Sequence, residues 1–107
     1  MTYNIVLICQ NGASTTILVD KMLASANSKG IDVVINAYPE HKLEFVVDEA
    51  DLVLLAPQIR HKKKAILEKY SEKNVPFMSV DPMDYGMMDG EKVLDLALKE
   101  LEKEGRE

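Results

Sequence analysis

The chain has 107 residues, 18 of them acidic and 13 basic, which predicts one domain spanning residues 1–107 with a net charge of −5. Its single cysteine excludes an internal disulfide, a four-cysteine zinc site and a Cys-x-x-Cys redox pair, and a reduced thiol suits a cytoplasmic protein. No apolar run exceeds five residues, against about 20 for a membrane span, and the acidic balance without a basic-aromatic patch disfavours nucleic acid as a partner.

Apolar and amphipathic segments alternate along the chain. In chain order, the patterns predict a strand at residues 5–8, a helix at 14–29, a strand at 33–35, one or two helical turns at 41–47, a strand at 52–55, a helix at 58–71, a strand at 75–80 and a helix at 91–103. The first three strands are continuous apolar runs, typical of strands buried on both faces, whereas Pro76 fits an edge strand or a strand start. Gly30 stands where a helix commonly ends.

This alternation implies an α/β fold. Strands and helices at this spacing form a parallel open sheet with helices on both faces, and four strands in so short a chain suggest the order 2-1-3-4. Ligands of such sheets bind beyond the carboxyl ends of the strands, where the order reverses between strands 1 and 3. Cys9 stands at this point of the predicted fold, directly after the first strand.

The connection between the first strand and the first helix has the composition of a phosphate-binding loop. It consists of Cys9, Gln10, Asn11, Gly12, Ala13, Ser14, Thr15 and Thr16. Small residues let a ligand approach the backbone, hydroxyl groups serve as helix caps or ligand donors, and the backbone N–H groups at a helix start attract anions. The same positive field favours the thiolate, the reactive form of cysteine. We therefore predict Cys9 as a nucleophile that forms a phosphocysteine, with residues 10–16 holding the phosphate.

Other interpretations of this loop remain open. Cys9 by itself is compatible with a small, buried apolar side chain at a strand end. The Walker loop and the dinucleotide fingerprint Gly-x-Gly-x-x-Gly are both absent. A regulatory module that binds an anion without covalent chemistry would use the same loop, and it is the second functional class to test.

Three segments together resemble one known family. They are residues 5–21 with Cys9, Gly12 and the hydroxyl groups at 14–16, residues 52–59, and residues 84–90 with Asp84-Tyr85-Gly86 before Asp89-Gly90. In these features nearly the whole chain resembles the IIB component of the bacterial phosphoenolpyruvate-dependent sugar phosphotransferase system (PTS), of the lactose/cellobiose type. The resemblance implies that Cys9 accepts phosphate from a phosphohistidine of a IIA component. It also implies transfer to a sugar, such as cellobiose or lactose, that a membrane IIC component holds.

Low-molecular-weight tyrosine phosphatases share the predicted architecture and provide an alternative enzyme. Their loop is Cys-x5-Arg, whereas the sixth residue after Cys9 is Thr15. A positioned Arg binds phosphate bidentately, and losing one such donor costs about 10²–10³ in rate. Asp81 follows the fourth strand, where a phosphatase would carry its general acid. We therefore keep Asp81, together with Gln58 after the third strand, as possible accessory residues.

The remaining polar and methionine residues give weaker signals. His41 and His61 are expected to be exposed, and neither a metal site nor a cofactor site is expected. Residues 60–64 (Arg-His-Lys-Lys-Lys) indicate a solvated helix face or a surface that steers an acidic or phosphate-bearing partner. Four methionines between residues 78 and 88 indicate either core packing or an adaptable docking surface.

Overall fold

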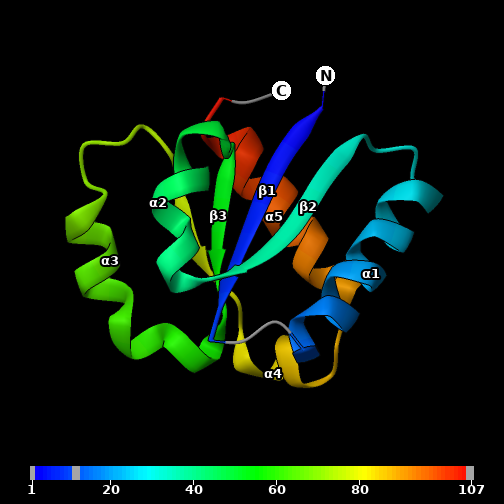
Figure 1. Ribbon diagram of the computed structural model, residues 1–107. Coiled ribbons are helices and arrows are strands. Elements are labelled where there is room, and N and C mark those ends of the chain that lie inside the picture. The colour runs from blue at the N-terminus through cyan, green and yellow to red at the C-terminus, as the bar shows by residue number, and fades with distance from the viewer. Residues whose placement is uncertain (1, 11–12, 106–107) are drawn as a thin grey trace.

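Within the residues that the structure describes, four parallel strands form one sheet (Figure 1). The computed structural model describes residues 2–10 and 13–105, with residues 13 and 14 described by their backbone only. The strands are β1 (Tyr3–Cys9), β2 (Val33–Pro39), β3 (Leu52–Leu55) and β4 (Phe77–Ser79), paired in the order β2-β1-β3-β4. The α/β fold and the strand order 2-1-3-4 predicted from the sequence are therefore confirmed.

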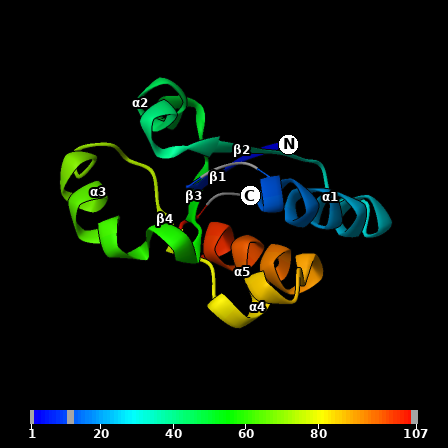
Figure 2. The ribbon, with the colours of Figure 1, turned by 60° about the horizontal axis from the view of Figure 1, so that its bottom comes forward.

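Helices cover both faces of this sheet, as predicted (Figure 2). In chain order, with η for a 3-10 helix, they are α1 (Ala13–Ser28), η1 (Glu40–Lys42), α2 (Leu43–Val46), η2 (Val47–Glu49), η3 (Pro57–Lys62), α3 (Lys63–Lys69), α4 (Pro82–Gly86) and α5 (Gly90–Lys103). Because successive side chains of a strand point to opposite faces, β1 serves both layers. Leu7 packs in the layer of α1 and α5, whereas Val6 and Ile8 pack in the layer of α2 and α3.

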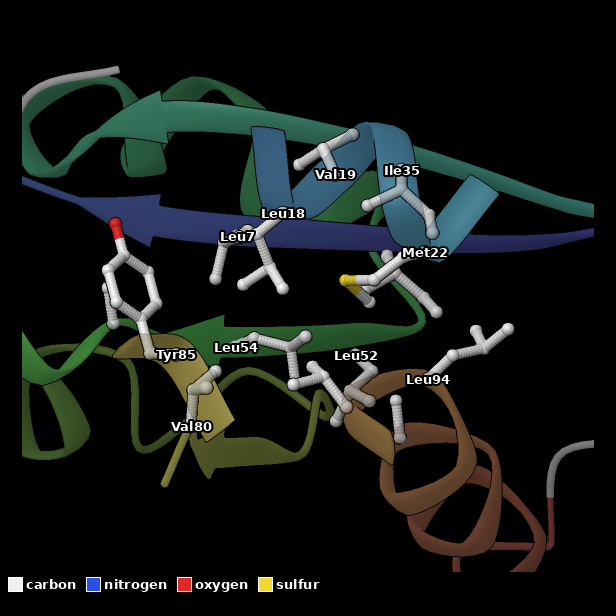
Figure 3. Packing of buried hydrophobic residues seen from close by; sticks show 14 of the residues in the cluster. Leu7, Leu18, Val19, Met22, Ile35, Leu52, Leu54, Val80, Tyr85 and Leu94 are labelled. Atoms are coloured by element: carbon white, nitrogen blue, oxygen red, sulfur yellow. The ribbon is translucent and has the colours of Figure 1, made fainter. Parts of the chain in front are cut away.

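One apolar stripe holds α1 against the sheet. Leu18, Met22 and Ala26 recur every four residues, so they share one face of the helix, and all three are buried. Figure 3 shows the first two between the sheet and α5. Burying a side chain such as Leu18 stabilises the fold by about 1.5–3 kcal/mol. The stripe therefore fixes the start of α1 beside the carboxyl end of β1.

The structure corrects three local predictions. The strand at 33–35 is not buried on both faces: Val34, on the edge strand β2, is 46 % exposed. The segment predicted as one helix over 58–71 begins as a 3-10 helix, since Ile59 has non-helical dihedral angles (φ −112°, ψ 15°). Helix α4 was not predicted at all. It begins where the Asp81 carboxylate accepts hydrogen bonds from the backbone N–H groups of Met83 and Asp84.

Helices α1 and α5 approach each other closely at Gly90. A Cβ atom placed there would lie 2.6 Å from the backbone carbon of Lys21 and from the backbone nitrogen of Met22. We predict that Gly90→Ala lowers the free energy of unfolding by about 1–3 kcal/mol, because the two backbones must move apart. Gly86→Ala is the matched control, since its Cβ would meet no atom within 4 Å. Equal urea midpoints for the two variants would contradict this prediction.

Candidate active site around Cys9

Cys9 is the last residue of β1 and stands at the switch point of the sheet. The chain leaves β1 toward α1 on one face, whereas it leaves β3 toward η3 and α3 on the other. Cys9 is fully buried, and its Sγ–H group donates to the carbonyl oxygen of Tyr38 in β2, 3.7 Å from the sulfur. The thiol is therefore shielded from solvent, and it lies where sheets of this order bind ligands.

A hollow of about 240 Å³ lies beside the cysteine. It is lined by Cys9, Gln10, Pro39, Glu40, His41, Ile59 and Lys62. Lys62 Nζ lies 2.8 Å from Glu40 Oε1 and forms an ion pair with it. His41 is exposed, as predicted, but the turn after β2 also brings it to this hollow, which the sequence did not indicate. The hollow thus combines a buried thiol with charged side chains from η1 and η3.

The first part of the predicted phosphate-binding loop borders this hollow. Gln10 is exposed and lines it, whereas Asn11 and Gly12 lie outside the described residues. Helix α1 begins at Ala13, so Ala13 and Ser14 belong to the first turn of a 16-residue helix. The positive end of a helix dipole and its free backbone N–H groups attract phosphate. The predicted helix start is therefore confirmed within one residue.

Thr15 and Thr16, the last two predicted loop residues, have different surroundings. Thr16 is exposed, but Thr15 is fully buried in a hydrogen-bond network. Thr15 Oγ1 lies 2.9 Å from Tyr85 Oη, and Gln58 Nε2 donates to the same tyrosine oxygen at 2.9 Å. In Figure 3 the Tyr85 side chain extends from α4 toward the end of β1. The network joins α1, η3 and α4 near the carboxyl ends of the strands.

Tyr85 is a further residue of this site that the sequence analysis did not predict there. It is buried on α4, and its neighbour Asp84, also buried, lies 3.2 Å from Lys92 Nζ of α5 through its Oδ1 atom. With the Asp81 cap, these contacts hold α4 in place below the network. In the sequence, Tyr85 stands out only as part of the segment 84–90 that carries the family resemblance. That resemblance does not indicate which residues its hydroxyl group contacts.

Comparison with known proteins shows the family. Residues 4–96 match the model for the lactose/cellobiose-specific IIB subunit of the PTS. The chain belongs to this family. The IIB protein is 36 % identical over 94 residues to the oligo-β-mannoside-specific EIIB component of Bacillus subtilis, a match that covers 88 % of this chain and 91 % of the relative. Over 98 residues it is 35 % identical to the galactose-specific EIIB component of Lactococcus lactis subsp. cremoris, with 87 % and 91 % covered.

A solved structure supports the same assignment. The solution structure of the cellobiose-specific phosphotransferase IIB component from Borrelia burgdorferi matches with a TM-score of 0.84 at 42 % identity, covering 97 % of this chain and 95 % of that one. As a IIB component, this protein is a phosphoryl carrier and a phosphotransferase in sugar phosphorylation, and the system implies IIA and IIC partners. In the part of the chain that is described, no helix is long and apolar enough to cross a membrane. Nor do three or more His, Cys, Asp or Glu residues gather there into a metal site.

The two possible accessory residues of the IIB protein occupy different places. Gln58 reaches the predicted phosphate-binding loop through the Tyr85 hydroxyl group. The Asp81 carboxylate caps α4 and lines a second hollow, of about 350 Å³, together with Pro57 and Arg60. The lining of the Cys9 hollow does not include Asp81. Among the described residues, the side chain of Gln58 is therefore connected to Thr15 through the Tyr85 hydroxyl group, whereas the Asp81 carboxylate bonds the start of α4.

The basic run at 60–64 divides in the structure. Lys62 lines the Cys9 hollow, whereas Arg60, Lys63 and Lys64 line a separate hollow along α3. His61 is exposed, as predicted. Because a helix has 3.6 residues per turn, neighbouring side chains point in different directions, so the run does not form one helix face.

The methionines after β4 divide as well. Met78 and Met88 pack against the core, which confirms core packing for these two. Met83 and Met87 are 71 % and 69 % exposed. For the exposed pair, a docking surface stays a prediction.

Proposed function

We propose that Cys9 is the phosphoryl acceptor of this IIB protein, with a phosphohistidine of the IIA component as donor. The observation that carries this proposal is the position of Cys9, at the switch point of the sheet and shortly before the first turn of α1. The sulfur attacks phosphorus in line, so that an S–P bond forms while the N–P bond breaks and the imidazole takes the electron pair. In the next step a sugar hydroxyl oxygen attacks the same phosphorus, so that an O–P bond forms while the S–P bond breaks, and the departing sulfur takes up the hydroxyl proton.

The resting contact of the thiol has a role in this proposal. A thiolate has no proton to donate, so ionisation removes the hydrogen bond between Cys9 and the Tyr38 carbonyl oxygen. The sulfur, repelled by that oxygen, then turns toward the hollow from which a phosphoryl group approaches. Residues 10–16 bind the transferred phosphate through backbone N–H groups, and the dipole of α1 stabilises its negative charge.

Phosphorylation by the complete upstream system tests the proposal. After incubation with phosphoenolpyruvate and the phosphate-transferring proteins up to IIA, we expect one phosphate on the peptide that contains Cys9, as measured by mass spectrometry. His41 provides the critical comparison, because it lines the same hollow and histidine is the other common phosphoryl acceptor. Phosphate on a peptide with His41 or His61, and none on Cys9, would show that the proposal is wrong.

The stability of the phosphocysteine separates a carrier from a phosphatase. A phosphatase loop has a phosphate-binding Arg at the position of Thr15, but here this side chain is buried and bonded to Tyr85. Without that donor we expect hydrolysis about 10²–10³ slower than the turnover of a phosphatase intermediate. Phosphate loss from the isolated, phosphorylated protein as fast as a phosphatase intermediate turns over would favour a phosphatase instead.

We further propose that the protein acts in the cytoplasm and that the final acceptor is a β-disaccharide such as cellobiose or lactose. The relatives differ in their sugars, which are oligo-β-mannosides, galactose and cellobiose. In this system the IIC component holds the sugar, so transfer from phosphorylated protein to a panel of sugars in IIC-containing vesicles identifies the acceptor. Transfer to monosaccharides alone would contradict the proposal.

A further inference from the structure

The geometry points to Lys62 as a residue that binds the phosphoryl group on Cys9. We propose that phosphorylation draws the Lys62 ammonium group away from Glu40 and onto the phosphoryl oxygens inside the Cys9 hollow. This inference rests on the proposed function, because it needs a phosphocysteine at position 9.

Cys9 and Lys62 share one hollow. Cys9 and Lys62 both line it, although they lie 53 positions apart in the sequence. Among the described residues, Lys62 is the only lysine in that lining, and no arginine lines it. A lysine has a flexible four-carbon stem and three N–H donors, so it can follow a phosphate that moves between partners.

The ion pair that holds Lys62 is exposed to solvent. Its Nζ lies 2.8 Å from Glu40 Oε1, but the Lys62 and Glu40 side chains are 50 % and 38 % exposed. Ion pairs with this much solvent exposure contribute little, so the competing anion does not need to overcome a strong contact. The Glu40–Lys62 pair is therefore an exchangeable one.

A phosphoryl group on Cys9 would change the charge of the hollow. A phosphoryl group adds about −1.5 to −2 charges at neutral pH, and Glu40 already contributes −1. The other titratable side chain of the lining, apart from Cys9, is His41. A phosphocysteine therefore makes the hollow strongly anionic unless Lys62 turns toward it. The same change frees Glu40, which then repels the phosphoryl group.

The basic run itself supplies a charge-matched control. Lys64 lies two residues further along and lines the hollow along α3, not the Cys9 hollow. A surface that only steers an acidic partner responds about equally to the loss of Lys62 or Lys64. Direct binding of the phosphoryl group responds to Lys62 alone.

The test measures the equilibrium of phosphoryl exchange between phosphorylated IIA and the full chain. The measured quantity is the equilibrium ratio of phosphorylated to unphosphorylated chain. We expect Lys62→Gln to lower this ratio about three- to tenfold, because it removes one charge contact in a solvated site. Lys64→Gln should change it less than twofold, and Lys62→Arg should restore most of the wild-type value. Glu40→Gln should raise the ratio, because it removes a competitor for Lys62 and a repulsive charge.

The sign of the Glu40→Gln effect separates phosphate binding from a structural role. If the ion pair served only to hold η1 against η3, both Lys62→Gln and Glu40→Gln would lower the ratio, and that result would overturn the inference. Equal effects of Lys62→Gln and Lys64→Gln would overturn it as well. These results require that wild-type Cys9 becomes phosphorylated. If it does not, the proposed function itself is wrong, which distinguishes the two failures.

Discussion

Cys9→Ser will abolish phosphoryl transfer from the IIA component to this IIB protein while the fold persists. A serine hydroxyl oxygen is far less nucleophilic than a cysteine sulfur, so we expect a loss of about 10³-fold or more. The hydroxyl group keeps a donor for the Tyr38 carbonyl oxygen, which the cysteine thiol contacts in the structure. Labelled phosphate bound to the chain after incubation with phosphorylated IIA measures the effect.

The same variant distinguishes a carrier from an anion-binding module. A module that uses the loop only to hold phosphate binds inorganic phosphate equally well with Ser at position 9, and neither form takes up covalent phosphate. A carrier loses covalent phosphate in Cys9→Ser and retains it in His61→Gln, a variant of an exposed histidine outside the lining of the Cys9 hollow. Covalent labelling of Cys9→Ser at the wild-type rate would rule out Cys9 as the acceptor.

Tyr85→Phe will weaken both the fold and the transfer step. The change removes the oxygen that contacts Thr15 Oγ1 and Gln58 Nε2, and it leaves the buried threonine hydroxyl group without this partner. We expect the free energy of unfolding to fall by about 1–3 kcal/mol. Thr15 lies in the first turn of α1, so we also expect transfer from IIA to slow by roughly tenfold to 10²-fold as the predicted phosphate-binding loop loses its position.

Tyr70→Phe provides the matched control for this prediction. It makes the same chemical change on a buried tyrosine in the layer of α2 and α3, on the opposite face of the sheet. We expect it to leave the transfer rate unchanged. A double-mutant cycle between Tyr85→Phe and Thr15→Val should show coupling, with the double variant less destabilised than the sum of the single ones. Additive stability effects, or a wild-type transfer rate in Tyr85→Phe, would mean that Tyr85 does not position the loop.

The architecture could be predicted from local patterns in the sequence. The apolar runs at 5–8 and 52–55 are the central strands, because only a strand covered on both faces buries so continuous a run. Their alternation with amphipathic segments gave the parallel sheet and its order. The position of Cys9 followed from the same patterns, since it stands directly after the first strand and before residues that suit the start of a helix. The exposure of β2 did not follow, because β-branched residues also occur in edge strands.

The partners within the site were decided by tertiary structure alone. Tyr85 meets Thr15, 70 residues away in sequence, and Gln58, 27 residues away, because α4 packs below the ends of β1 and β3. The sequence could not distinguish Lys62 from the other lysines of its run either. In the folded chain this side chain pairs with Glu40 and lines the hollow beside the cysteine, whereas Lys63 and Lys64 line another hollow. Hydrophobic patterns and turn residues act between near neighbours in the chain, so the sequence itself determined the elements, their order and the place of Cys9 after the first strand. Hydrogen bonds and ion pairs between distant segments depend on where the strand ends converge, and that is a property of the folded chain.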